Sequence, residues 1–273
     1  MKKVVIQGIR GAFHEEAVHQ WFGTDIEIVP ELLFKNLVEL VATEKSDYAM
    51  MAIENTLSGT IHGNLRLIAE NEVEICGEVN LRIEQNLGVL NGFKLAELIE
   101  VRSHYMALEQ CRSYFKDYPH IRLVEVADTA LAAQQIADEK LERVGAIGSI
   151  KAMEHYGLNL LASGIQSNKE NFTRFVVLRK KSDVENEAFN KVSLNIVLPH
   201  KPGSLAKLLN AFAEFGLDLV KLESIPIIGQ PYHYQFIMDV LIDHPKDLES
   251  ALQKANDLTE KCVILGKYKS AVQ

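Results

Sequence analysis

Short apolar runs alternate with helix-like stretches through the first part of the chain. Buried strands are predicted over residues 4–6, 26–29 and 48–53, and helices with apolar positions three and four residues apart over residues 13–21 and 32–42. This alternation is typical of a mostly parallel sheet that is covered by helices on both faces.

The alternation starts again near residue 80, after an extended segment over residues 81–90. Further elements are predicted as strands at residues 99–101, 121–126, 144–147 and 172–178 and as helices at residues 106–115 and 129–137. Two similar α/β units of this kind predict a bilobed region with a cleft between the lobes. We expect the lobes at about residues 1–80 with 165–182, and at residues 81–164.

The last third of the chain has a different order of elements. Residues 179–187 are polar and charge-rich, which predicts a solvated linker and a domain boundary near residue 185. The pattern that follows predicts strand, helix, strand, strand, helix and strand, at residues 192–198, 204–215, 217–224, 234–242, 248–259 and 263–268. This βαββαβ order is ferredoxin-like, so we expect domains at residues 1–182 and 190–273. Ser204 is the candidate N-cap of the first of these helices.

Composition and charge narrow the class of protein. The 273 residues carry 29 basic and 37 acidic side chains, a formal charge of −8, which disfavours binding to nucleic acid or to anionic membranes. No apolar run reaches the roughly 20 residues of a membrane-spanning helix, and the first residues hold too short an apolar stretch for a signal peptide. The three cysteines lack disulfide-scaffold or zinc-site spacing, and the nine histidines lack metal-site spacing. We therefore expect a cytoplasmic protein without a metal.

Residues with polar side chains, or a glycine that exposes backbone N–H groups, follow several predicted strands, at the edge where ligands of open α/β folds usually bind. They are, in chain order, Gly11, Asn55, Thr56, Asp128 and Ser149. Tight turns and helix capping explain each of them separately. Together they suit a small molecule with several negative charges, bound by backbone amides and hydroxyls.

The stretch Asn171-Phe172-Thr173-Arg174-Phe175 is the most informative part of the sequence. An arginine at the start of a strand, between two aromatic residues, is suited to hold a carboxylate through two hydrogen bonds. The neighbouring threonine hydroxyl can donate a hydrogen bond to a leaving oxygen. An ordinary strand with one exposed arginine is the alternative.

With these motifs in this order, the chain resembles the prephenate dehydratase family over essentially its whole length. The motifs are Gly8-x-x-Gly11-x-Phe13, Ile53-Glu54-Asn55-Thr56, Asp128-Thr129-Ala130, Ile147-Gly148-Ser149 and the stretch at 171–175. Residues 201–205 and 222–226 resemble the two phenylalanine-site motifs of an ACT domain. The resemblance implies a catalytic region similar to periplasmic binding proteins, followed by an ACT domain.

The resemblance also implies the reaction and the residues that carry it. Prephenate would lose its ring carboxylate and its para hydroxyl together, giving phenylpyruvate, carbon dioxide and water without a cofactor. Thr173 would be catalytic, and the substrate would be bound by Gly11, Asn55, Thr56, Ser149, Arg174 and Phe175. Arg174 would either clamp a carboxylate or orient Thr173. L-phenylalanine would regulate a homo-oligomer, dimer or tetramer, through Pro202, Gly203, Ser204, Leu205, Leu222, Glu223 and Ser224.

Two other functions stay open at this point. An arogenate dehydratase would accept an amino group in place of the keto group, and a non-catalytic sensor would bind a ligand without turnover. The chain also departs from the family with Ala12-Phe13-His14 for Thr-Phe-Ser, His104-Tyr105-Met106 for His-Pro-Gln, and Ile225 for an arginine. The resemblance therefore assigns no role to positions 12, 14, 105 and 106.

Overall fold

A computed structural model describes residues 1–182 and 188–271 of the chain. The predicted boundary near residue 185 lies outside the described residues. The chain divides into two compact units, each of which is discontinuous in sequence. The first unit comprises Met1–Leu37, Tyr48–Ile61 and Val79–Phe175, and the second comprises Val38–Asp47, His62–Glu78 and Val176–Gln273.

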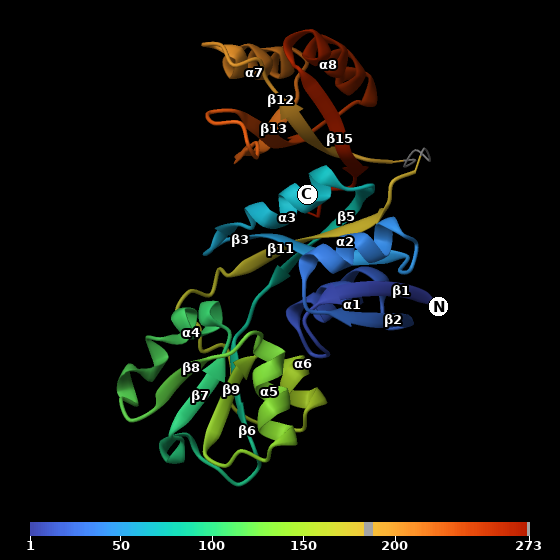
Figure 1. The fold of residues 1–273 in the computed structure, drawn as a ribbon. Coiled ribbons are helices and arrows are strands. Elements are labelled where there is room, and N and C mark those ends of the chain that lie inside the picture. The colour runs from blue at the N-terminus through green and yellow to red at the C-terminus, as the bar shows by residue number, and fades with distance from the viewer. Residues whose placement is uncertain (183–187, 272–273) are drawn as a thin grey trace. The chain divides into compact units, whose positions relative to one another are not determined.

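The first sheet has the strand order β2-β1-β3-β11-β5, with β4 paired to β3 (Figure 1). Its strands are β1 (Lys2–Gln7), β2 (Ile26–Glu31), β3 (Tyr48–Asn55), β4 (Gly59–Thr60), β5 (Val73–Arg82) and β11 (Phe172–Lys180). Its helices are α1 (Phe13–Phe22), α2 (Phe34–Ala42) and α3 (His62–Glu70). The strand β1 pairs in parallel with β2 and β3, which confirms the predicted parallel sheet. The first part of β5 was not predicted.

The second sheet has the order β10-β6-β9-β7-β8. Its strands are β6 (Asn86–Val89), β7 (Glu100–Ser103), β8 (Arg122–Glu125), β9 (Val144–Gly148) and β10 (Asn159–Ala162). Its helices are α4 (Tyr105–Cys111), α5 (Thr129–Asp138) and α6 (Ile150–His155), with 3₁₀ turns at Leu95–Glu97 and Tyr114–Asp117. The predicted helix at residues 106–115 is thus wrong in its second half, and β10 was not predicted.

The third sheet is antiparallel, with the order β13-β14-β12-β15 (Figure 1). Its elements are β12 (Lys191–Val197), α7 (Ser204–Glu214), β13 (Asp218–Pro226), β14 (Tyr234–Leu241), α8 (Pro245–Leu258) and β15 (Lys261–Tyr268). Leu208 and Phe212 of α7 and Leu248 of α8 pack in one core with apolar strand residues. The predicted bilobed α/β region and ferredoxin-like unit are confirmed.

Helix starts determine which polar side chains act as caps. Asp128 caps α5, and Ser149 caps α6 by accepting a hydrogen bond from Ala152 N, both as predicted. The prediction for Ser204 is wrong, because Gly203 is the N-cap of α7 and Ser204 is the first helical residue. Gly203 has φ 80°, a left-handed conformation that glycine adopts without strain. Among the described residues, no helix is long and apolar enough to cross a membrane.

Candidate active site

A pocket of about 400 Å³ lies in the first unit and is lined by elements of the first and second sheets. Its walls come from the starts of α1, α4 and α5, the end of β3, the segment between β5 and β6, and β11. Of the predicted site residues, Asn55, Thr173 and Phe175 line it. No lysine or arginine is among the described residues of its lining, so an anion here would be held by neutral donors.

Asn55 orients the hydroxyl of Thr173. The Asn55 Oδ1 atom accepts hydrogen bonds from the backbone N–H groups of Leu57 and Ser58, both at 3.0 Å, so its Nδ2 atom is the donor. Nδ2 lies 2.9 Å from Thr173 Oγ1, a side chain that is buried on β11. Because Oγ1 accepts this bond, the hydroxyl hydrogen is available for donation to a ligand.

A series of amide hydrogen bonds continues from Asn55. Asn55 Nδ2 also donates to Asn171 Oδ1 at 2.8 Å, and Asn171 Nδ2 donates to Gln110 Oε1 at 3.0 Å. Gln85 Nε2 donates to the same Gln110 oxygen at 3.2 Å. Thr173 on the first sheet and Gln85 in the segment that leads to the second sheet are therefore joined by side-chain hydrogen bonds. Both glutamines lie outside the recognised motifs, so neither was predicted as a site residue.

His14 places a neutral imidazole in the pocket wall. Its ring centroid lies 4.9 Å from that of Phe175 and 5.7 Å from that of Phe34. Burial lowers the pKa of His14 to about 3, so the imidazole is uncharged near neutral pH. Its Nε2 atom is buried and has no hydrogen-bond partner among the described residues. Position 14 is one to which the family resemblance assigned no role.

Two further polar side chains line the pocket at helix starts. The Asp128 carboxylate accepts hydrogen bonds from Ala130 N at 2.9 Å and Leu131 N at 3.1 Å, and burial raises the pKa of this carboxyl. His104 Nδ1 accepts a hydrogen bond from Met106 N at 3.3 Å. In the neutral form this leaves the other ring nitrogen of His104 as a donor.

Gly11, Ser149 and Thr56 lie outside the pocket lining and hold backbone in place. Ser149 Oγ donates to Gly11 O at 2.6 Å. A Cβ atom at Gly11 would lie 2.6 Å from Ala152 Cα, and φ is +87°, so this close approach requires glycine. Thr56 Oγ1 donates to the carbonyl of residue 170 at 2.9 Å and accepts from the N–H of residue 172 at 3.0 Å.

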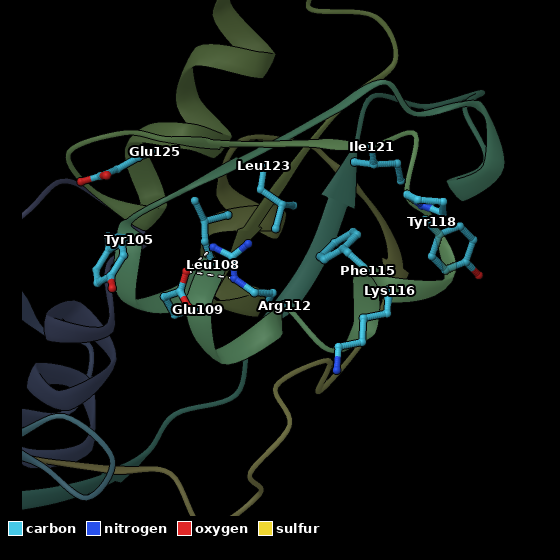
Figure 2. Close-up of a pocket in the computed structure, with 11 residues that line it drawn as sticks. Tyr105, Leu108, Glu109, Arg112, Phe115, Lys116, Tyr118, Ile121, Leu123 and Glu125 are labelled. Atoms are coloured by element: carbon cyan, nitrogen blue, oxygen red, sulfur yellow. Dashed lines mark hydrogen bonds and ion pairs between the residues drawn. The ribbon is translucent and has the colours of Figure 1, made fainter.

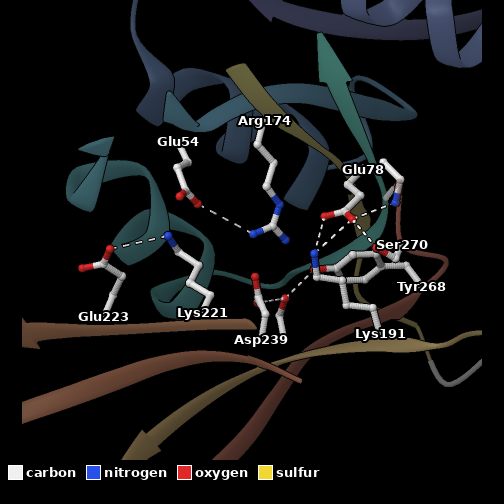
Figure 3. Close-up of polar contacts among 11 residues, drawn as sticks. Glu54, Glu78, Arg174, Lys191, Lys221, Glu223, Asp239, Tyr268 and Ser270 are labelled. Carbon is white, nitrogen blue, oxygen red and sulfur yellow. Dashed lines mark hydrogen bonds and ion pairs between the residues drawn. The ribbon is translucent and has the colours of Figure 1, made fainter. Parts of the chain in front are cut away.

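Arg174 lies on the other face of β11. Side chains alternate along a strand, so Thr173 and Phe175 share the face toward the pocket and Arg174 points away from it. Its Nη1 atom lies 4.0 Å from Glu54 Oε2 (Figure 3). The ion pair joins β11 to β3, the neighbouring strand that ends in Asn55.

A larger hollow of about 550 Å³ lies beside α4, the 3₁₀ turn Tyr114–Asp117 and β8 (Figure 2). Two of its charged residues, Glu109 and Arg112, form an ion pair with each other. None of the predicted catalytic or substrate-binding residues lines it. Its size alone therefore does not make it the candidate active site.

The predicted effector residues lie in the second unit. Ser204 and Leu205 line a small pocket of about 140 Å³ together with residues 197–201 and 232–234. The second predicted motif, residues 222–224, is not part of this lining. In that motif, Glu223 lies 3.1 Å from His62 Nε2 and 3.5 Å from Lys221 Nζ.

Family models match nearly the whole chain. The model for prephenate dehydratase matches residues 4–183, and that for the ACT domain matches residues 192–260. A bifunctional chorismate mutase/prephenate dehydratase of Aquifex aeolicus is 34% identical, over 99% of this chain and 74% of the relative. Arogenate dehydratase 2 of Petunia hybrida is 38% identical, over 84% of this chain and 58% of the relative.

Solved structures share the fold. A prephenate dehydratase from Arthrobacter aurescens in complex with L-Phe has a TM-score of 0.90 and 26% identity, and the match covers 98% of this chain and 90% of that one. A structure described as a novel type of quorum quenching acylase has a TM-score of 0.89 and 28% identity, over 99% of both chains. Similar folds thus occur in proteins with different described activities.

Proposed function

Because the chain belongs to the prephenate dehydratase family, we propose that it converts prephenate into phenylpyruvate, carbon dioxide and water. The observation that carries the proposal is the Asn55–Thr173 contact in a pocket that has no lysine or arginine among the described residues of its lining. The bond to the ring carboxylate breaks and its electron pair enters the ring. The C–O bond breaks in turn, and the hydroxide that leaves takes up a proton to become water. Since aromatisation drives this reaction, the protein mainly positions the substrate and stabilises the leaving oxygen.

Thr173 is the catalytic residue in this proposal. Its hydroxyl donates a hydrogen bond to the leaving oxygen of the substrate, while Asn55 holds the Thr173 oxygen from the other side. A threonine hydroxyl is a weak acid, so it stabilises the developing hydroxide by hydrogen bonding more than by an early proton transfer.

The other predicted substrate residues divide into two groups. Asn55 and Phe175 line the pocket and meet the substrate there. The remaining four act through the backbone or through Thr173, and they are Gly11, Thr56, Ser149 and Arg174. For Arg174 we propose the orienting role, because its contact with Glu54 lies on the face of β11 that does not line the pocket.

The test is turnover of purified protein with prephenate and with arogenate. We expect phenylpyruvate from prephenate, a fall in kcat of about 100- to 1,000-fold for Thr173→Val, and partial recovery in Thr173→Ser. A protein that turns over arogenate alone would be an arogenate dehydratase, and one that binds prephenate without turnover would be a sensor. Either result would contradict the proposal, as would wild-type rates in Thr173→Val.

We propose that the chain consists of a catalytic domain at 1–182 and a regulatory ACT domain at 190–273. L-phenylalanine lowers the activity by binding the ACT domain. The motif residues involved are Pro202, Gly203, Ser204, Leu205, Leu222, Glu223 and Ser224. Gly203→Val introduces a side chain where φ is 80°, so it should raise the L-phenylalanine concentration for half-inhibition. Inhibition curves with equal midpoints for wild type and Gly203→Val would place the effector elsewhere.

Assembly and location complete the proposal. We propose a homo-oligomer, either dimer or tetramer, in the cytoplasm, and light scattering of the purified chain would measure the mass. Three free cysteines support a reducing compartment. Burial raises the pKa of the Cys111 thiol to about 12, so this group is unreactive.

A further inference from the structure

Gln85 holds a buried oxygen atom in the wall of the active-site pocket, and this atom has no partner within residues 1–182 and 188–271. The residue is 3% exposed and lines the pocket together with Thr173. Its backbone is fixed, because Gln85 N donates to Gln166 Oε1 at 2.9 Å. Its Oε1 atom has no hydrogen-bond partner among the described residues. Buried acceptors in native proteins are nearly always paired, so this atom points to a ligand.

The hydrogen-bond series decides that the free atom is oxygen and not nitrogen. Amide oxygen and nitrogen are assigned from their partners. Asn55 is fixed because its Oδ1 accepts from two backbone N–H groups, so its Nδ2 donates and Asn171 must present an oxygen to it. Asn171 then donates through Nδ2 to Gln110 Oε1. Gln85 can meet that same oxygen only with Nε2, which leaves Gln85 Oε1 free.

A free amide oxygen only accepts hydrogen bonds, so its partner must carry a hydrogen. The two carboxylates and the keto group of prephenate are acceptors, and its ring hydroxyl is the single donor. We propose that Gln85 Oε1 binds the ring hydroxyl that leaves during the reaction. This inference rests on the proposed function and assigns one more substrate-binding residue to the same pocket.

The two ends of the amide series are complementary to a hydroxyl group. Thr173 can donate to the hydroxyl oxygen, and Gln85 Oε1 can accept the hydroxyl hydrogen. When the C–O bond breaks, both of its electrons stay on oxygen, and the hydroxide keeps its own hydrogen bonded to Gln85. It then takes up a proton from solvent and leaves as water. Gln85 thereby orients the leaving group without accepting a proton itself.

The test uses two saturated analogues of prephenate that cannot become aromatic, one with the ring hydroxyl and one without it. Calorimetry measures the binding of both to wild type, Gln85→Met and Gln135→Met. Gln135 is the matched control, because its Oε1 is also buried without a partner in the part of the chain that the structure describes, but it does not line the pocket. We expect wild type and Gln135→Met to prefer the hydroxyl analogue by about tenfold. In Gln85→Met this preference should be several-fold smaller, because only the Thr173 contact with the hydroxyl remains, and the affinity for the other analogue should be unchanged.

An undiminished preference for the hydroxyl analogue in Gln85→Met would overturn the inference. An equal loss of affinity for both analogues would also overturn it, because it would indicate a structural role for Gln85. Steady-state assays add a second measurement, in which kcat/KM for prephenate falls about tenfold or more in Gln85→Met. A loss confined to arogenate would assign the oxygen to an ammonium group and overturn the inference. If wild type turns over prephenate and Gln85→Met has the same kcat/KM, the inference is refuted but the proposed function is not. A wild type without turnover of prephenate refutes the proposed function and the inference with it.

Discussion

Two buried polar regions of this chain are built in opposite ways. Besides the helix-capping carboxylate of Asp128, the polar lining of the pocket of the first unit consists of amides, hydroxyls and imidazoles. Two of its lining atoms, His14 Nε2 and Gln85 Oε1, lack partners among the described residues. The second unit buries charges, but pairs them. Lys191 Nζ lies 3.0 and 3.1 Å from the two carboxylate oxygens of Glu78 (Figure 3).

Neighbouring groups complete the polar cluster of the second unit. Glu78 Oε1 also accepts from Ser270 Oγ at 3.3 Å, and Ser193 Oγ lies 2.5 Å from Asp239 Oδ1 and 2.7 Å from the Tyr268 hydroxyl. A charge removed from water is tolerated only with partners of this kind, whereas a binding pocket keeps groups free for its ligand. Paired charges therefore indicate structure here, whereas an unpartnered neutral atom in the lining of a pocket indicates binding.

The largest effect should come from breaking the ion pair of the second unit. Glu78→Ala leaves the Lys191 charge buried without its carboxylate and should lower the free energy of unfolding by about 3–5 kcal/mol. Urea unfolding measures the loss. The matched control is Glu214→Ala, which removes an exposed ion pair with Lys254 and should cost less than about 1 kcal/mol. Equal losses in the two variants would contradict the structural role of the buried pair.

A change in the amide series should affect activity more than stability. Asn55→Asp keeps the oxygen that accepts from Leu57 and Ser58 but removes the donor to Thr173 and Asn171. We expect kcat to fall by about 10- to 100-fold, because Thr173 loses its orienting partner. Kinetics and a urea curve on the same preparation measure both quantities. An unchanged kcat would show that Asn55 does not position Thr173.

The sequence predicts the framework of the site better than its chemistry. Hydrophobic periodicity predicts most strands of all three sheets, because burial repeats at fixed spacings along each element. The recognised motifs include Asn55, Thr173 and Phe175, which meet in one pocket although more than 100 positions separate Asn55 from the other two. That pairing follows from the place of β11 beside β3.

Other parts of the site could not be predicted from motifs. Gln85 and Gln110 have no periodic signal, and their roles appear only when folding brings them to Asn171. Arg174 was predicted to act directly or through Thr173. Adjacent residues of a strand point to opposite faces, so the strand prediction alone already separates the Arg174 side chain from Thr173.

The buried, unprotonated His14 should make the free energy of unfolding depend on pH. Its pKa is about 3 in the folded chain, below the value of about 6.5 expected after unfolding. Between these values the unfolded chain binds the additional proton, so stability falls as pH falls, by up to about 1.4 kcal/mol per pH unit. We expect His14→Phe to reduce this slope in urea unfolding at pH 7 and pH 5.5. The exposed variant His120→Gln is the control, and equal slopes in both variants would contradict the assignment.

The smallest effect is expected for Ser149, a paired polar residue of the first unit that can be compared with the unpaired groups of the pocket. Ser149 is buried but fully engaged, because its Oγ donates to Gly11 O and accepts from Ala152 N. Ser149→Ala should therefore behave like a structural change, lowering the free energy of unfolding by about 1 kcal/mol and changing kcat/KM by less than about threefold. Ser149→Thr, which keeps the hydroxyl, is the control. A tenfold loss of kcat/KM with unchanged unfolding would instead make Ser149 a substrate contact, and pairing would no longer separate structural from binding residues in the first unit.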